Sequence, residues 1–147
     1  MDKLELEAKV AEYSKLEEWN HDYSFPFGIN TNDKLKSSPG NNINKWKRLE
    51  KIFETINIKN KSIIDLGCSD GYYSNKCAEL GAKNVLGIDL DNLRINRAKF
   101  ASEILKINNV EFKYLDFYDD HGWNCNSKDC WPILWHIYRE FHFVKII

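Results

Sequence analysis

The sequence predicts an α/β fold in which short parallel strands alternate with helices. Three short apolar runs, residues 62–66, 84–89 and 110–115, have the length and the Ile, Val and Leu content of strands. Helical stretches of about 10 residues from Tyr72 and about 15 residues from Asn92 lie between these runs. Connections of this length suit right-handed crossovers, so the alternation predicts a parallel sheet.

Two further helices are expected before the first strand. Spacings of three and four residues define two apolar helix faces, one with Leu6, Val10, Tyr13, Leu16 and Trp19, and one with Trp46, Leu49, Ile52, Phe53 and Ile56. Residues 23–40 between them are rich in turn-forming residues, which predicts a loop with a short extended piece. We therefore divide the chain into a helix-and-loop extension over 1–45, an α/β half-domain over 46–120 and an irregular aromatic-rich tail over 121–147.

Size and composition predict one globular domain in the cytoplasm. The chain has 147 residues, of which 43% are hydrophobic. It contains no apolar run of about 18 residues, and its first five residues are too charged for a secretion signal, so no membrane contact is expected. The four cysteines and four histidines lack the spacing of a zinc site, so no metal is predicted. The net charge of −1 argues against a surface built wholly for nucleic acid.

A glycine-bearing turn follows the first predicted strand and leads into a helix. The stretch reads Asp65-Leu66-Gly67-Cys68-Ser69-Asp70-Gly71-Tyr72. Glycine lets the chain turn sharply and lets a ligand approach the backbone, while N–H groups at a helix start favour a negatively charged ligand group. Asp89 ends the second predicted strand, where a carboxylate can accept hydrogen bonds from both ribose hydroxyls. Together these features indicate an adenosine-containing ligand with an unblocked ribose.

Two cofactor classes use this layout. A dinucleotide site favours G-x-G-x-x-G, and counting from Gly67 the second and third glycine positions hold Ser69 and Tyr72. A tyrosine obstructs the close packing of helix and strand that the third glycine permits, so a nicotinamide cofactor is the minor alternative. The Walker pattern is absent from the sequence, which argues against the usual ATP or GTP site.

The same residues resemble three ordered motifs of class I S-adenosylmethionine-dependent methyltransferases. The motifs are Asp65 to Gly71, Gly87-Ile88-Asp89 and Tyr114-Leu115-Asp116-Phe117. The resemblance implies a partial Rossmann-like class I methyltransferase fold, with strands in the order 3-2-1 and flanking helices on both sheet faces. It also implies S-adenosyl-L-methionine as cofactor.

The resemblance assigns a part of the cofactor to each motif. It implies that Asp65 and the loop Gly67 to Gly71 hold the methionine part, Asp89 the ribose hydroxyls, and Asp116 with the backbone of Phe117 the adenine edge. Ser69 departs from the family, which most often has glycine there. The complete predicted cofactor-binding set is Asp65, Gly67, Cys68, Ser69, Gly71, Asp89, Leu90, Asp116 and Phe117.

A narrower resemblance concerns the acceptor. The order Phe25 to Thr31, then Trp46-Lys47-Arg48, then the glycine loop is similar to the group that contains bacterial wobble-uridine tRNA methyl- and carboxymethyltransferases. This resemblance suggests tRNA as the methyl acceptor. In the carboxymethylating members a basic residue before the counterpart of Gly28 is expected to hold the extra carboxylate. None of the residues from Tyr23 to Phe27 is basic, so ordinary S-adenosylmethionine is the expected cofactor.

Two features have a structural interpretation beside the functional one. The segment 34–51 contains one acid, Glu50, and the cations Lys34, Lys36, Lys45, Lys47, Arg48 and Lys51. These cations could contact RNA phosphates, or they could form an ordinary solvated face. Cys68 could be a reactive thiol with a lowered pKa, or a small packing residue.

The tail after Asp120 contains no recognisable fourth motif. A complete domain of this family would add on the order of 100 residues beyond Asp120. The chain is therefore expected to be incomplete as a single enzyme, with a tail produced by truncation or a shifted reading frame, or to be completed by a second chain. If the tail is genuine, Phe141 to Ile147 would pair with the first strand and cover its edge.

Three functional hypotheses stay open at this point. The first is an S-adenosylmethionine-dependent methyltransferase that acts on tRNA. The second is a non-catalytic cofactor-binding module or an inactive gene remnant. The third is a fragment of a nicotinamide-dependent oxidoreductase. The sequence does not identify the catalytic residues.

Overall fold

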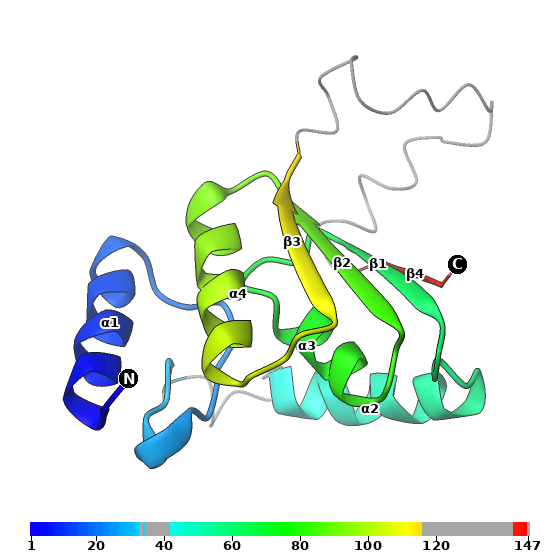
Figure 1. Ribbon diagram of the computed structural model, residues 1–147, viewed down its shortest axis with the longest axis horizontal. Helices are drawn as coiled ribbons and strands as arrows, with labels where there is room; N and C mark the ends of the chain where they lie inside the picture. Colours follow the sequence, from blue (N-terminus) through cyan, green and yellow to red (C-terminus); the bar gives the residue numbers. More distant parts are fainter. Residues whose placement is uncertain (33, 35–41, 116–142, 147) are drawn as a thin grey trace.

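The computed structural model describes residues 1–32, 34, 42–115 and 143–146 (Figure 1). The predicted cofactor residues Asp116 and Phe117 lie outside these ranges, as does most of the tail.

The centre of the fold is a sheet of four short strands in the order β3-β2-β1-β4. The parallel strands are β1 (Ser62–Leu66), β2 (Asn84–Asp89) and β3 (Val110–Tyr114), so the predicted order 3-2-1 is confirmed. β4 (Phe143–Ile146) pairs antiparallel with β1 on its outer side. The predicted pairing of the C-terminal residues with the first strand is thus confirmed for β4, whereas residues 141, 142 and 147 lie outside the described part.

Three helices pack on one face of this sheet. They are α2 (Asn42–Thr55), α3 (Tyr72–Glu79) and α4 (Asn92–Ile104). Ile63 of β1 and Val85 of β2 belong to one apolar cluster with side chains from all three helices, and Phe112 of β3 packs against α4.

The opposite face is formed by residues such as Ile64 and Leu86, which are half-buried, and Glu111, which is exposed. No helix covers this face among the described residues. Helices were expected on both faces of the sheet. The described fold contains the helix layer on one face only.

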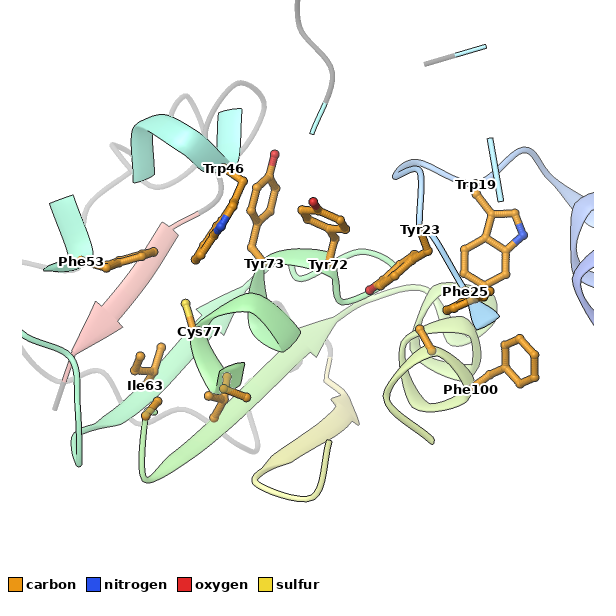
Figure 2. Close-up of a cluster of buried hydrophobic side chains, with 14 of the residues drawn as sticks. Trp19, Tyr23, Phe25, Trp46, Phe53, Ile63, Tyr72, Tyr73, Cys77 and Phe100 are labelled. Carbon is orange, nitrogen blue, oxygen red and sulfur yellow. The ribbon is translucent and has the colours of Figure 1, made fainter. Parts of the chain in front are cut away.

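The N-terminal extension packs beside α4. Helix α1 (Lys3–Leu16) begins with a capping box between Asp2 and Glu5, and Leu6 and Val10 are its buried positions. The helix ends at Leu16, which is 69% exposed, while Trp19 beyond it is 1% exposed. The predicted apolar face was therefore wrong at Leu16. Figure 2 shows Trp19, Tyr23, Phe25 and Phe100 gathered beside α4.

The following loop contains the short extended piece that was predicted. A β-bridge joins Ser24 and Asn30 on either side of the 3-10 turn η1 (Pro26–Gly28). Within the described residues no helix combines the length and apolar character needed to cross a membrane, and no group of three potential ligands is arranged to hold a metal ion.

Candidate functional site

The glycine loop joins β1 to α3 at the carboxyl ends of the parallel strands. It turns through left-handed conformations at Gly67 (φ 73°), Ser69 (φ 53°) and Gly71 (φ 78°). Glycine adopts this conformation without strain, whereas a residue with a side chain does so at some cost. The conformation at Ser69 explains why glycine is common at this position in the family that the sequence resembles.

Gly71 and Gly87 are needed for close packing below the loop. A Cβ atom at Gly71 would lie 2.7 Å from both Ala98 Cβ and the Phe112 ring, and one at Gly87 would lie 2.6 Å from the same ring. The Phe112 ring therefore fits against two glycines on neighbouring segments. This packing brings α4 and β3 close to the start of α3. In a dinucleotide site the third glycine, at position 72, would permit such close packing; here Gly71 permits it and position 72 holds Tyr72.

Most backbone N–H groups of the loop are used inside the fold. Gly67 and Cys68 both donate to the carbonyl oxygen of Ile88, over 2.8 and 3.0 Å, and Gly71 donates to the Cys68 carbonyl over 2.9 Å. These bonds fasten the loop to the end of β2. They also leave the loop poorly suited to cradle a pyrophosphate, because such a group is held by several unused N–H groups.

Asp89 lies beside the loop with its carboxylate directed at backbone donors. Ser69 N donates to Asp89 Oδ2 over 2.8 Å, and Asp91 N donates to Oδ1 over 3.0 Å. A carboxylate offers about four acceptor positions, so these two bonds leave room for two more donors. Asp89 therefore fits the predicted role of accepting hydrogen bonds from two ribose hydroxyls. Leu90, the next predicted contact residue, is half-buried and follows it directly.

Asp65 supports the loop from beneath. Its side chain is fully buried and accepts a hydrogen bond of 2.6 Å from Ser74 Oγ of α3. The carboxylate thus links the end of β1 to the helix that follows the loop. Its predicted contact with the methionine part of the cofactor stays a prediction.

Cys68 is a packing residue. It is 0% exposed and lies in a cluster with Ile95, Ala98 and Phe112. Burial, together with the nearby charge of Asp65, raises the pKa of the Cys68 thiol far above its usual range. The hypothesis of a lowered pKa was therefore wrong, because desolvation of the thiolate outweighs the helix start.

Asp70 is a site residue that the sequence analysis did not single out. It is 0% exposed, and its Oδ2 accepts hydrogen bonds from Asn20 N over 2.8 Å and His21 N over 3.2 Å. The His21 ring contacts Oδ1 through Nδ1, and Tyr23 Oη donates to the Asp70 carbonyl over 2.7 Å. The N-terminal extension is therefore part of the loop's surroundings. No local spacing could have indicated contacts between residues about fifty positions apart.

Comparison with known proteins identifies the family. A family model described as "Methyltransferase domain" matches residues 57–131, just over half of the 147-residue chain. The chain belongs to the methyltransferase domain family. This membership confirms the predicted class I methyltransferase fold, with S-adenosylmethionine as cofactor. The nicotinamide alternative, already disfavoured by Ser69 and Tyr72, has no support from it.

Individual relatives of this methyltransferase domain are considerably longer. The tRNA U34 carboxymethyltransferase of Campylobacter fetus is 31% identical over 83 residues, which cover 55% of this chain and 29% of the relative. The enzyme of the same name from Nautilia profundicola is 29% identical over 99 residues, which cover 64% of this chain and 31% of the relative. The chain thus spans about a third of these relatives' length.

A solved structure supports the fold. The N-terminal domain of EvdMO1, determined in the presence of SAH and D-fucose, superimposes with a TM-score of 0.55 at 21% identity and covers 79% of this chain and 46% of that one.

Proposed function

We propose that this methyltransferase domain binds S-adenosylmethionine across the glycine loop and the end of β2, and supplies the cofactor-binding part of an enzyme that methylates tRNA. The observation that carries the cofactor site is the Asp89 carboxylate, buried beside Ser69 N with acceptor positions left for two hydroxyls. The backbone of the loop from Gly67 to Gly71 would lie along the methionine part, and Asp116 with Phe117 along the adenine edge.

The reaction places simple demands on these residues. Methyl transfer from a sulfonium is a direct displacement, so the protein has to hold the acceptor atom in line with the S–CH₃ bond and exclude water. Asp89 and the loop orient the cofactor for this step. A base is needed only where the acceptor atom carries a proton that must leave.

A cationic surface on α2 supports an RNA acceptor. Lys45, Lys47, Arg48 and Lys51 are exposed, and none of the four forms an ion pair with another described residue. Trp46 and Phe53 anchor the opposite side of α2 in the core. Because Trp46 is 7% exposed, it is a core residue and not a stacking platform for a base. Two relatives of the chain are named tRNA U34 carboxymethyltransferase, which also supports this acceptor.

We propose that a second chain contributes to the acceptor pocket of this enzyme. In the family that the sequence resembles, the acceptor pocket comes mostly from elements after the third strand. In the described fold one sheet face has no helix layer, with Ile64 and Leu86 half-buried there. The alternative is a non-catalytic cofactor-binding module. A coexpressed partner that restores methyl transfer to tRNA would favour the enzyme.

Isothermal titration with S-adenosylmethionine, S-adenosylhomocysteine and NAD tests the cofactor site. We expect the first two ligands to bind and NAD not to bind. Asp89→Ala should weaken binding of S-adenosylhomocysteine by about 1–3 kcal/mol, because the ribose hydrogen bonds are lost. Glu103→Gln, an exposed change on α4, is the matched control and should bind as the parent does. Unchanged affinity in the Asp89 variant would contradict the site assignment.

The RNA acceptor is tested by filter binding with bulk tRNA at two salt concentrations. Replacing Lys47 and Arg48 with glutamine should weaken binding and reduce its salt dependence, because fewer counterions are released from the RNA. The control replaces Lys99 and Lys106 with glutamine. Both are exposed; Lys99 lies on α4 and Lys106 lies just after it. Equal losses in the two double variants would show that α2 is not a specific RNA surface.

A further inference from the structure

The segment 17–23, between α1 and the β-bridge, is fastened to the cofactor half of the fold mainly by two buried side chains, beside the ion pair of Glu17 with Arg94 and the bond from Asn75 to Tyr23. The first is Arg97 of α4, whose side chain is 0% exposed. Its guanidinium donates to the carbonyl oxygens of Tyr13 (2.7 Å) and Glu18 (3.2 Å) and to that of Glu17. These carbonyls belong to the last turn of α1 and the residues after it, where no helical N–H remains to bond them. A buried cation thus caps α1 and fixes where the segment begins.

The second fastening point is Asp70 in the glycine loop. Its carboxylate accepts the backbone N–H groups of Asn20 and His21 and contacts the His21 ring. The His21 ring also stacks on Tyr72, with ring centroids 5.4 Å apart at 13°. With its oxygens occupied in this way, the fully buried Asp70 side chain is directed at the segment and not at the cofactor position.

Ser69 connects the segment to the ribose-binding carboxylate. Asn20 Nδ2 donates to Ser69 Oγ over 2.7 Å, and Ser69 N donates to Asp89 Oδ2 over 2.8 Å. Ser69 holds a left-handed conformation, which is strained for a residue with a side chain. Such a conformation persists when surrounding contacts fix it, and the contacts here come from Asn20 on one side and Asp89 on the other.

We propose that residues 17–23 form a wall of the cofactor site, and that Asp70 and Arg97 are positioning residues whose hold on this wall determines how long the cofactor stays bound. When the segment is released, Ser69 loses the bond from Asn20 and can relax from its left-handed conformation. The N–H group of Ser69, which orients the Asp89 carboxylate, then moves. The ribose hydroxyls of the cofactor lose a carboxylate that was already oriented to accept their hydrogen bonds. This inference rests on the proposed cofactor site.

Two measurements on the full chain test the inference. Stopped-flow fluorescence gives the association and dissociation rates of S-adenosylhomocysteine, and NMR hydrogen exchange gives the protection of individual backbone amides. For Asp70→Asn and Arg97→Lys we expect dissociation to be faster by roughly tenfold, with association within about twofold of the parent. Exchange at the Asn20 and His21 amides should accelerate in Asp70→Asn, while the Gly67 and Cys68 amides, bonded to Ile88, keep their protection.

Control variants separate positioning from general destabilisation. Lys99→Gln removes an exposed α4 cation that forms no ion pair with another described residue, and should leave both rates unchanged. Asn20→Ala removes only an exposed side chain and its bond to Ser69, so it should fold even where the buried variants do not. It should speed dissociation by about threefold.

The outcomes distinguish this inference from the proposed function. A parent chain that does not bind S-adenosylhomocysteine overturns both. A parent that binds, with unchanged dissociation in Asn20→Ala and in the folded buried variants, overturns the inference alone. Faster dissociation with unchanged exchange at Asn20 and His21 also overturns it, because Asp70 would then not act through the segment.

Discussion

Gly71 and Gly28 adopt nearly the same backbone conformation in different surroundings. Their φ angles are 78° and 73°. A Cβ atom at Gly71 would lie 2.7 Å from Ala98 and Phe112, whereas one at Gly28 would meet nothing within 4 Å. Comparing alanine at the two positions therefore separates the cost of a left-handed backbone from the cost of a steric clash of the added Cβ atom.

We expect both alanine variants to lower the free energy of unfolding, by different amounts. Gly28→Ala should cost about 1–2 kcal/mol through backbone conformation alone. Gly71→Ala should cost about 1–3 kcal/mol more, because the ring of Phe112 and helix α4 must shift. Urea unfolding followed by circular dichroism measures both. Equal losses would show that the packing below the loop adapts without cost.

The residues of the site differ in how far the sequence could predict them. Asp89 and the loop glycines stand in ordered local motifs, and the structure brings them together at the ends of β1 and β2. Asp70 lies inside the same motif, yet its partners Asn20 and His21 are about fifty residues away. Arg97 bonds carbonyls about eighty residues away. Local spacing carries no information about such contacts.

At the element scale, the strands were predicted more accurately than the helix faces. The runs 62–66 and 84–89 coincide with β1 and β2, because a short apolar stretch bounded by polar residues has few alternatives in an α/β chain. The residues from Trp46 to Ile56 were predicted to form one apolar helix face, but Ile52 is 54% exposed and Ile56, just beyond α2, is 40% exposed. Periodicity marks one face of a helix without showing how much of that face a neighbour covers.

Strand β4 covers an edge of β1 that would otherwise present unpaired backbone groups. It pairs with β1 from Leu66↔Phe143 to Ile63↔Ile146. Replacing both Val144 and Lys145 with proline should break this pairing, since proline has no N–H to donate. We expect the variant to self-associate at lower protein concentration, which sedimentation velocity measures. The control replaces the same two residues with threonine, which favours strands. Equal association of both variants would show that β4 does not protect β1.

At the scale of the whole molecule, the core encloses several weakly acidic groups around the site. Burial raises the pKa of the Cys68 and Cys77 thiols and of the Tyr23 and Tyr73 hydroxyls, and the charges of Asp65 and Asp70 add to the effect. Two of these residues, Cys77 and Tyr73, lie side by side in the cluster of Figure 2 that joins β1 to α2 and α3. The native chain therefore holds these protons more tightly than the unfolded chain does.

This difference predicts how stability depends on pH. Below about pH 8.5 all four groups are protonated in both states, so their contribution is fully present. Above that value the thiols ionise first in the unfolded chain, and above about pH 10 the tyrosines follow, so stability falls by up to about 1.4 kcal/mol per pH unit for each group. Urea unfolding between pH 8 and 11 should show a decline that steepens near pH 10. Cys77→Ala should flatten it from about pH 8.5, and Tyr23→Phe only above about pH 10. If Cys77→Ala and Tyr23→Phe both showed the same dependence of stability on pH as the parent, these groups would already titrate in the native chain. Water would then reach the core around the glycine loop.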